Sequence, residues 1–331
     1  MHILVTGGCG FIGSHLVRHF VTAGHRVTVA DRFSYAGKAR RVEDLLPRVD
    51  LLVGDLAQGD LPYRCVEAQP DVVLHTAAET HVDRSILDPT TFLINNPLGT
   101  SRLLDAFAKH DGPLPRFVVY STDEVYGPQQ DWTPDSLRHE LSPFNPSNAY
   151  SASKVAVEAV CNAFRVTHGL LIIIVRPCNV YGCGQHPEKA IPKWAGQLLR
   201  GESPTIYNDG QGFRDWMYDL DHCRAIQCVL DQWALAEEMR VINLARGDWR
   251  TDQQVFDALS QEIGGLQCVR KLVPGRPGHD KGYAMTGTRL SLLGFRPQVP
   301  FEEGLRRVVR WLLACPNFWD HDLAKVSRAN R

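Results

Sequence analysis

The sequence feature that most constrains the fold is a run of glycines that follows directly on a short apolar stretch. Residues 2–6 have the pattern of a buried strand, and Gly7, Gly10 and Gly13 come next at a GxxGxxG spacing. A helical pattern then extends to about residue 23. This order predicts a tight turn whose backbone N–H groups, at a helix start, hold a pyrophosphate. The candidate cofactor contacts in this turn are Gly7, Gly10, Phe11, Ile12 and Gly13.

An acidic residue after the second strand indicates which dinucleotide such a turn would bind. That strand, residues 26–30, ends in Asp31, roughly 20 residues beyond the glycines. A carboxylate there suits the adenosine ribose hydroxyls and would repel a 2′-phosphate, so the sequence favours NAD over NADP. Arg32, the next residue, weakens that preference.

Two further apolar strands bring candidate residues to the same edge. Residues 51–53 lead to Asp55, which would either accept a hydrogen bond from the adenine amino group or cap the next turn, and the sequence leaves both open. Residues 71–75 lead to small side chains that would let the backbone lie against a cofactor. The cofactor candidates added here are Asp55, Leu56, Ala77 and Ala78.

Helical patterns alternate with these strands along the first half of the chain. Such alternation predicts an α/β protein of the Rossmann type, with a doubly wound parallel sheet. Residues 91–109 have the pattern of one long helix, in which Pro97 would either lie early or interrupt it.

Two adjacent carboxylates follow another apolar strand, residues 116–120. Asp123 and Glu124 come just past its end, where ligands bind in an open α/β sheet. Neighbouring side chains on extended or turning backbone point in different directions, so one carboxyl can be buried and protonated while the other stays ionised. The pair would then supply a general acid and a general base. The alternative is structural, with Thr122 or Asp123 capping the next helical turn.

A tyrosine and a lysine share one helix face further along. Tyr150 and Lys154 are four residues apart at the start of a helical pattern that runs to about residue 166. A lysine ammonium beside a phenol favours the phenolate, and a cationic nicotinamide would lower the pKa of Tyr150 further. Tyr150 is therefore a candidate base near neutral pH, although such pairs on many helices are only solvated surface contacts.

The regular alternation weakens after the strand at residues 170–175. Proline, glycine and basic residues then fill irregular connections, which predicts a smaller C-terminal α/β lobe for substrate. We expect an NAD-binding Rossmann domain over residues 1–177 with a returning segment at about 217–250. The substrate lobe would take residues 178–216 and 251–314, including a short strand at 268–269, and a tail would follow at 315–331.

Charge and cysteine content exclude several classes of function. The 36 basic and 37 acidic side chains give a net charge of −1, with no basic block to bind nucleic acid. Apolar runs fall short of the roughly 18 residues of a membrane span. Nine scattered cysteines without a CxxC pair suit reduced thiols in the cytoplasm better than disulfides or a metal site. We therefore expect a cytoplasmic protein with no metal, no nucleic-acid partner and no membrane.

Taken in order, these motifs resemble those of the extended short-chain dehydrogenases/reductases. Within that superfamily the chain is most similar to the dTDP-glucose 4,6-dehydratases, over roughly residues 1–314. The adjacent Asp123 and Glu124 are the diagnostic match, because related 4-epimerases and decarboxylases usually lack that pair. Other matches lie at residues 77–85, at Tyr150 to Lys154, at residues 186–189, at Arg214-Asp215-Trp216 and at residues 277–280.

The resemblance implies a role for each catalytic candidate. Tyr150 would take the proton of the C4 hydroxyl of a nucleotide-linked hexose while NAD takes the C4 hydride. Lys154 would lower the pKa of Tyr150 and hold the nicotinamide ribose, and Thr122 would bond the C4 oxygen. Glu124 would remove the C5 proton, and protonated Asp123 would donate to the departing C6 hydroxyl. Hydride return to C6 would give a 4-keto-6-deoxy sugar.

Substrate contacts are implied in the same way, by position in the matching motifs. Arg214 suits a pyrophosphate because its guanidinium makes paired contacts, although an ordinary ion pair explains it too. The substrate candidates are Glu79, His81, Thr122, Asn179, Glu188, Lys189, Tyr207, Arg214 and His279.

Three positions depart from the dehydratase pattern. Val180 stands where the relatives have a second asparagine, Gly212 where they commonly have asparagine, and Gly282 where they often have a basic residue. All three lie in the predicted substrate lobe. We therefore expect dehydration chemistry to be kept while the nucleotide base or the sugar differs.

Two other functions remain open. One is a nucleotide-sugar 4-epimerase or decarboxylase that uses Tyr150, Lys154 and NAD without elimination at C6. The other is a non-catalytic NAD-binding protein. The resemblance also implies a homodimer, paired through helices at residues 98–109 and 149–166, with apolar contacts from Val155, Val157, Val160 and Phe164.

Overall fold

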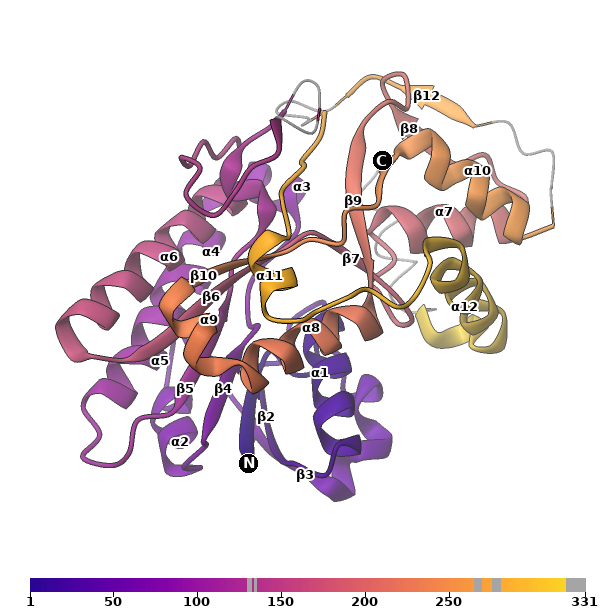
Figure 1. Ribbon diagram of the computed structural model, residues 1–331. Helices are drawn as coiled ribbons and strands as arrows, with labels where there is room; N and C mark the ends of the chain where they lie inside the picture. Colours follow the sequence, from indigo (N-terminus) through magenta and orange to yellow (C-terminus); the bar gives the residue numbers. More distant parts are fainter. Residues whose placement is uncertain (130–132, 134–135, 265–269, 276–280, 320–331) are drawn as a thin grey trace.

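A seven-stranded parallel sheet forms the centre of the computed structural model, which describes residues 1–129, 133, 136–264, 270–275 and 281–319 (Figure 1). Its strand order is β10-β6-β5-β4-β1-β2-β3, and every neighbouring pair is parallel. The strands are β1 (His2–Thr6), β2 (Arg26–Asp31), β3 (Val49–Val53), β4 (Val72–His75), β5 (Arg116–Tyr120), β6 (Leu171–Pro177) and β10 (Val241–Leu244). The predicted doubly wound sheet is confirmed.

Helices cover both faces of this sheet, because strand side chains alternate between two apolar clusters. Ile3 and Val5 pack on one face with α1 (Phe11–Thr22), α8 (Asp219–Asp231) and α9 (Trp233–Met239). Leu4 packs on the other face with a second group of helices. That group is α2 (Leu61–Glu67), α5 (Gly99–Ala108) and α6 (Ala149–His168).

The long helix expected at residues 91–109 exists, but its geometry changes around Pro97. It consists of α4 (Pro89–Leu93), a π-helical segment η3 (Ile94–Leu98) and α5. Proline has no N–H to donate, and the wider turn accommodates it without ending the helix. The buried Asn96 of η3 donates to the Glu79 carbonyl oxygen and to Ser153 Oγ. The irregular turn thus ties the segment after β4 to α6.

A smaller lobe lies beyond the carboxyl edge of the sheet, as predicted (Figure 1). It holds the sheet β11-β9-β7, from β7 (Asn179–Tyr181), β9 (Phe213–Tyr218) and β11 (Trp249–Thr251). It also holds the pair β8 (Thr205–Tyr207) and β12 (Lys271–Val273). Its helices α7 (Ala190–Leu199), α10 (Asp252–Glu262) and α12 (Phe301–Ala314) share one apolar cluster.

Strand β10 confirms that the chain returns to the main sheet at residues 241–244, beside β6. The exact domain bounds stay a prediction, and the strand expected at 268–269 lies outside the described residues. The remaining elements are short. They are α3 (Val82–Leu87), α11 (Thr288–Leu292), η1 (Ala39–Arg41), η2 (Glu43–Arg48), η4 (Asp123–Tyr126) and η6 (Pro316–Trp319).

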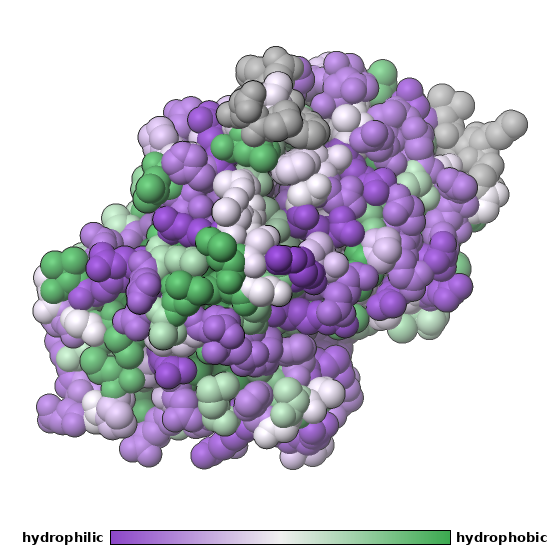
Figure 2. Space-filling view, in the orientation of Figure 1, coloured by the Kyte–Doolittle hydropathy of each residue, from purple (hydrophilic) through white to green (hydrophobic). Residues whose placement is uncertain are grey.

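The surface is mainly hydrophilic on the face shown in Figure 2, with apolar side chains in scattered groups. Among the described residues, no helix has the length and apolar character needed to cross a membrane. The same residues contain no group of three His, Cys, Asp or Glu side chains arranged to hold a metal ion. The eight cysteines that the structure describes are free thiols.

Candidate functional site

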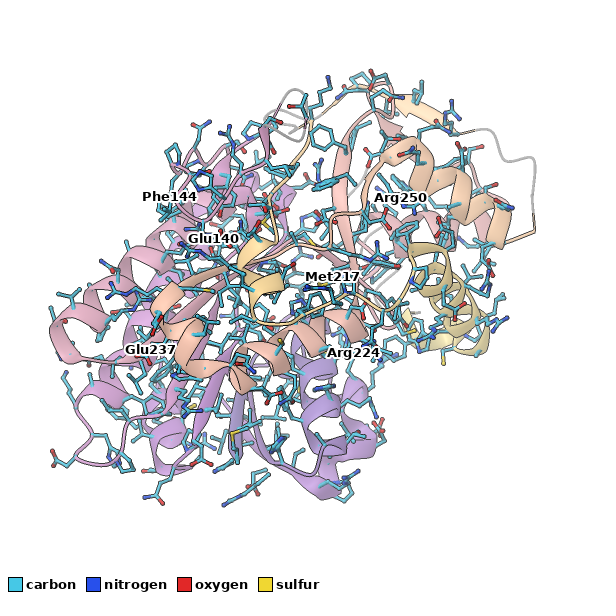
Figure 3. The ribbon with its side chains drawn as sticks, viewed as in Figure 1. Glu140, Phe144, Met217, Arg224, Glu237 and Arg250 are labelled. Atoms are coloured by element: carbon cyan, nitrogen blue, oxygen red, sulfur yellow. The ribbon has the colours of Figure 1, made fainter. Side chains whose placement is uncertain are left out.

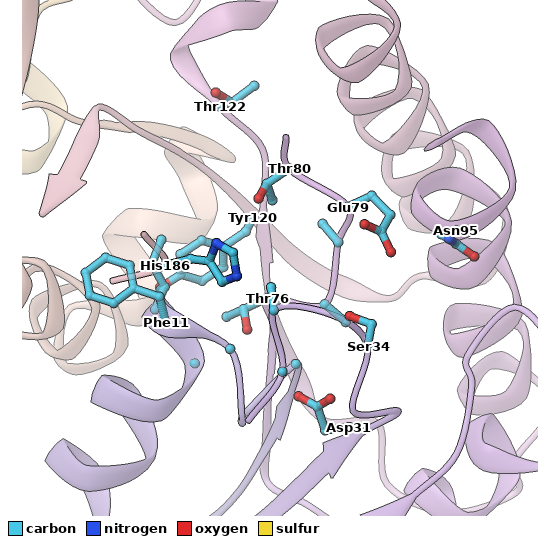
Figure 4. Close-up of a pocket in the computed structure, with 18 of the residues that line it drawn as sticks. Phe11, Asp31, Ser34, Thr76, Glu79, Thr80, Asn95, Tyr120, Thr122 and His186 are labelled. Carbon is cyan, nitrogen blue, oxygen red and sulfur yellow. The ribbon is translucent and has the colours of Figure 1, made fainter. Parts of the chain in front are cut away.

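A large cavity opens at the carboxyl ends of β1, β2, β4, β5 and β6, where the strand order reverses. Asp31 and Thr122 lie toward opposite ends of it in Figure 4. The predicted residues that line it are Gly7, Gly10, Phe11, Ile12, Gly13, Asp31, Asp55, Leu56, Ala77, Ala78, Glu79, Thr122, Asp123, Glu124, Tyr150, Lys154, Asn179, Glu188 and Lys189.

The glycine turn is packed too closely for any side chain. Gly7 has a left-handed φ of 70°, and a Cβ on it would lie 2.7 Å from the Cα of Ala77. A Cβ on Gly13 would lie 2.2 Å from the carbonyl oxygen of Gly7. The turn therefore presents bare backbone to the cavity at the start of α1, which suits a pyrophosphate.

Asp31 is fixed at the end of β2 by the glycine turn itself. Its carboxylate accepts hydrogen bonds from the backbone N–H of Cys9 at 2.9 Å and of Phe33 at 2.7 Å. Burial raises the pKa of Asp31, and these backbone hydrogen bonds lower it. The carboxylate is thus oriented at the place where adenosine ribose hydroxyls would lie.

Arg32 is held by two carboxylates of the same cavity. Its Nη1 donates to Asp55 Oδ2 at 2.9 Å and to Asn95 Oδ1 at 3.0 Å, and its Nη2 pairs with Glu79. A guanidinium neutralised in this way does not attract a 2′-phosphate, so the doubt that Arg32 raised about NAD is removed. Asp55 Oδ1 also accepts from the Ala57 N–H at 2.8 Å, which is the turn-capping interaction.

The Thr-Asp-Glu segment forms one 3₁₀ turn, η4, directly after β5. Thr122 caps it by accepting from the N–H of Glu124 at 3.3 Å. Asp123 is only 5% exposed. Burial, and then the negative charge of Glu124, raise the pKa of Asp123 to about 7. Glu124 is half-buried, and its Oε2 accepts from Asn148 Nδ2 at 3.3 Å.

The two carboxyls therefore differ as predicted in environment, while the capping interpretation also holds for Thr122. The sequence did not indicate the effect of Arg214 on this pair. Arg214 lies on a strand far from Asp123 in the sequence, and its positive charge acts to lower the pKa of Asp123.

Tyr150 and Lys154 lie on the first turns of α6 and are both buried. The Lys154 ammonium donates to the backbone carbonyl of Tyr120 at 2.8 Å, and burial lowers its pKa to about 8. Burial and the charge of Glu124 raise the pKa of Tyr150, while its hydrogen bond with Thr122 lowers it. The lowering expected from Lys154 is therefore not seen in these contacts, because its ammonium is directed at Tyr120.

A loop of residues 182–189, which we call the strap, lines the cavity and is hydrogen-bonded to the half of it that would hold the cofactor. Arg41, which is buried, donates from Nε and Nη2 to the Gly184 carbonyl at 3.1 and 3.0 Å and from Nη1 to the Cys9 carbonyl at 3.0 Å. His15 Nε2 lies 2.8 Å from the Cys183 carbonyl oxygen. No sequence pattern singled out either residue.

The strap carries Glu188 into a cluster of polar side chains. Tyr35 Oη donates to Glu188 Oε1 at 3.3 Å, and His81 Nε2 and His186 Nδ1 lie 3.4 and 3.5 Å from Oε2. Lys189 Nζ donates to the Thr80 carbonyl at 3.1 Å. His81 thus joins the predicted substrate candidates without lining the cavity, and Tyr35 and His186 are additions that the sequence did not predict.

Three further substrate candidates, like His81, do not line the cavity or lie outside the described residues. Arg214, on β9, donates to the carbonyls of Phe213 and Lys281 and lies over the ring of Tyr283 at 4.9 Å. Tyr207 lies at the end of β8. His279 lies outside the described residues.

The three positions that depart from the dehydratase pattern each lie at the cavity or close against another side chain. Val180 is 8% exposed and lines the cavity. A Cβ on Gly212 would lie 2.9 Å from Asp252 Oδ2, and one on Gly282 would lie 2.2 Å from the ring of Phe213. A basic side chain at position 282 would therefore collide with Phe213.

Comparison with known proteins agrees with this geometry. The family model described as the NAD dependent epimerase/dehydratase family matches residues 3–245. The chain belongs to this family. The extended short-chain dehydrogenase/reductase resemblance is thereby confirmed. The prediction of NAD is confirmed at the level of the family, whose description names that cofactor.

Relatives within the family cover nearly the whole chain. A dTDP-glucose 4,6-dehydratase of Streptomyces niveus is 38% identical, over 97% of this chain and 95% of its own. The low-salt glycan biosynthesis protein Agl12 of Haloferax volcanii is 37% identical, over 95% and 99%.

Solved structures of the family superpose on the same extent of the chain. DesIV of Streptomyces venezuelae, a dTDP-glucose 4,6-dehydratase crystallised with NAD, has a TM-score of 0.88 at 36% identity, covering 97% of this chain and 99% of its own. The UDP-glucose 4-epimerase of Thermotoga maritima has a TM-score of 0.86 at 28% identity, covering 96% and 100%.

Proposed function

We propose that the protein is an NAD-dependent nucleotide-sugar 4,6-dehydratase, a hydro-lyase of the dTDP-glucose to dTDP-4-keto-6-deoxyglucose type. The observation that carries the proposal is the pair Asp123 and Glu124 in one cavity with Tyr150 and Lys154. A simple 4-epimerase needs no acid–base pair for elimination at C6. Relatives of this name at 35–38% identity over nearly the full chain support it.

The cofactor half of the cavity fits NAD by its chemistry. The bare glycine turn suits the pyrophosphate, Asp31 suits the ribose hydroxyls, and neutralised Arg32 does not favour a 2′-phosphate. When bound, NAD supplies a hydride acceptor at C4 and a hydride donor at C6.

In the first step Tyr150 takes the proton of the C4 hydroxyl, and Thr122 hydrogen-bonds the C4 oxygen. The raised pKa of Tyr150 means that it needs a positive charge nearby to act as a base. The nicotinamide ring of oxidised NAD would supply that charge, while Lys154, on the next turn of α6, donates to the Tyr120 carbonyl.

In the second step Glu124 takes the C5 proton, which the new C4 ketone has made acidic. Asp123 gives its proton to the C6 hydroxyl, which leaves as water. A pKa of about 7 keeps a substantial part of Asp123 protonated at neutral pH and most of it protonated below, as a general acid requires. The C5 and C6 carbons are then joined by a double bond, which accepts hydride at C6 while protonated Glu124 returns a proton to C5.

We propose that the substrate is recognised by residues of the strap, by residues close to it and by residues of β9. Asn179, Glu188 and Lys189 line the cavity, His81 reaches Glu188, and Glu79 is held by Arg32. The remaining candidates are Tyr207, Arg214 and His279.

The test is incubation with a panel of dTDP-, UDP-, CDP- and GDP-hexoses in heavy water, read by mass spectrometry. Loss of one water with one deuterium gained at C5 would support dehydration and name the nucleotide. A product of unchanged mass but altered ring stereochemistry would favour the epimerase, and loss of carbon dioxide from a uronic acid would favour a decarboxylase. No turnover of any sugar, with NAD still bound, would favour a non-catalytic NAD-binding protein.

We also propose a homodimer in the cytoplasm. An apolar patch on α3, α4 and η3, which we call the α3–α4 patch, has exposed side chains. They are Ile86, Leu87, Leu93, Ile94 and Leu98. Such a cluster on the surface usually marks an interface. This patch lies mostly outside the helix pair that the sequence predicts at residues 98–109 and 149–166. Val157, expected on that pair, is 1% exposed and packs in the core, so it cannot contribute. Free cysteines support a reducing compartment.

A further inference from the structure

Behind the cavity lies a buried ion pair that the chemistry does not use. Glu158 and Arg176 are 5% and 3% exposed. Arg176 donates from Nη2 to Glu158 Oε2 at 2.6 Å and from Nε to Oε1 at 2.8 Å. Arg176 also donates to the Glu140 carbonyl and lies over the ring of Phe144, two residues that Figure 3 shows beside α6. Because this bidentate pair has two hydrogen bonds, it fixes the orientation of both side chains.

The ion pair is bonded to both ends of the Thr-Asp-Glu segment. Ser121, directly before Thr122, donates from Oγ to Glu158 Oε1 at 2.5 Å. Tyr126, two residues after Glu124, accepts at its hydroxyl from Arg176 Nη1 at 2.6 Å. The segment is therefore anchored on each side by contacts that do not involve its own two carboxyls, both of which line the cavity.

The anchors connect this segment to α6, the helix that carries the other two catalytic candidates. Glu158 lies one turn after Lys154 and two turns after Tyr150 on α6. That helix has 20 residues, begins in a capping box and packs a buried face on the sheet, so its position does not depend on the anchors. Turn η4 has 4 residues, too few to hold its own conformation. The position of Asp123 and Glu124 relative to Tyr150 thus depends on the anchors.

We propose that the Glu158–Arg176 pair is a positioning device that holds Asp123 and Glu124 in register with Tyr150 and Lys154. Its larger effect falls on the elimination step, because both groups of that step, Asp123 and Glu124, lie in the anchored segment, whereas oxidation at C4 uses Tyr150 and Lys154 of α6 and takes only Thr122 from the segment. The proposal rests on the proposed dehydratase function. It assigns roles to Ser121 and Tyr126 as well as to the ion pair.

The test uses Ser121→Ala and Tyr126→Phe, each of which removes one anchor and leaves the buried charges paired. Tyr126→Phe also removes the hydrogen bond that Tyr126 Oη donates to Asn243 Oδ1 at 2.7 Å. We expect product formation to fall about tenfold or more, because a small misplacement of an acid or base is costly. We also expect NADH absorbance to rise when substrate is added. Hydride taken from C4 has no acceptor at C6 until water has left, so the reduced cofactor and the 4-keto hexose accumulate together.

The matched control is Tyr181→Phe. Tyr181 is another fully buried tyrosine, and it donates to the Phe301 carbonyl at 2.9 Å in the smaller lobe. Its loss should lower the thermal midpoint as Tyr126→Phe does, with turnover and NADH absorbance like wild type.

Two outcomes contradict different parts of the argument. If wild type dehydrates a sugar and both anchor variants match it in rate without NADH accumulation, the ion pair is structural only and the proposal is wrong. If folded wild type dehydrates no nucleotide hexose, the proposed function is wrong and this assignment falls with it.

Discussion

Burial allows the side chain of Asp123 to act as a proton donor, which is unusual for an aspartate. This residue lies beside Glu124 in sequence, yet its low exposure and its neighbour's charge raise its pKa to about 7. Glu124 is more open and accepts from Asn148. One dipeptide therefore carries a proton donor and a proton acceptor.

Removing the carboxyl of Asp123 or that of Glu124 should each block a different proton transfer of the elimination. In Asp123→Asn we expect turnover to fall by about a hundredfold to ten-thousandfold, while Glu124 still exchanges the C5 proton with heavy water. In Glu124→Gln we expect the exchange itself to stop. Mass spectrometry of recovered substrate distinguishes the two, and the reverse pattern would exchange the roles assigned to them.

The pKa of Asp123 sets a pH limit on turnover. We expect kcat to fall as the pH rises above about 7, because the acid is then ionised. The free energy of unfolding also depends on the protonation of Asp123, and the direction of that dependence follows from its raised pKa. Its folded pKa lies above the ordinary 3.8, so between about pH 7 and pH 4 the folded chain keeps a proton that the unfolded chain releases.

Acidification through that range should therefore raise the contribution of Asp123 to stability. Thermal midpoints of wild type and Asp123→Asn, followed against pH, check this. The difference between them should narrow as the pH falls, and a constant difference would contradict the raised pKa.

At the scale of elements, helix α6 begins in a capping box that also reaches the site. Asn148 accepts from the N–H of Ser151 at 2.9 Å and donates to Glu124. We expect Asn148→Ala to lower the free energy of unfolding by about 1 kcal/mol and to lower kcat as well. Urea unfolding and steady-state kinetics measure the two effects.

The control is the second capping box of the chain. Thr251 caps α10 with Gln254 in the same way, away from the cavity. Thr251→Ala should lose similar stability with unchanged kcat. Equal activity in both variants would show that Asn148 acts only on the helix.

The main elements were predictable from the sequence, because their apolar periods are set by burial on one or two faces. The π turn around Pro97 was not, since it depends on the contacts of Asn96 with Glu79 and Ser153. The cavity residues next to strand ends were predictable for the same reason as the strands. The partners of Arg32 and Lys154 were not, because they come from separate strands and a backbone carbonyl.

At the scale of the whole molecule, the α3–α4 patch bears on assembly. Leu87 is 86% exposed within it. We expect Leu87→Glu to convert the proposed dimer to a monomer, because a charge there would have to be desolvated on association. Light scattering after gel filtration measures the mass.

Leu313, 60% exposed on α12, provides the matched control. Leu313→Glu should leave the mass of the assembly unchanged. A wild-type monomer, or a dimer that survives Leu87→Glu, would contradict the proposed interface.

The strap has a consequence for how the enzyme uses its coenzyme. Arg41 and His15 fasten residues 182–189 across the cavity through buried contacts. In the proposed reaction the hydride is returned within each turnover, so the chain has no need to exchange NAD with solution. Residence of the coenzyme would then be set by opening of the strap. Activity would be insensitive to the cellular ratio of NAD to NADH, unlike that of a dehydrogenase that releases its reduced coenzyme.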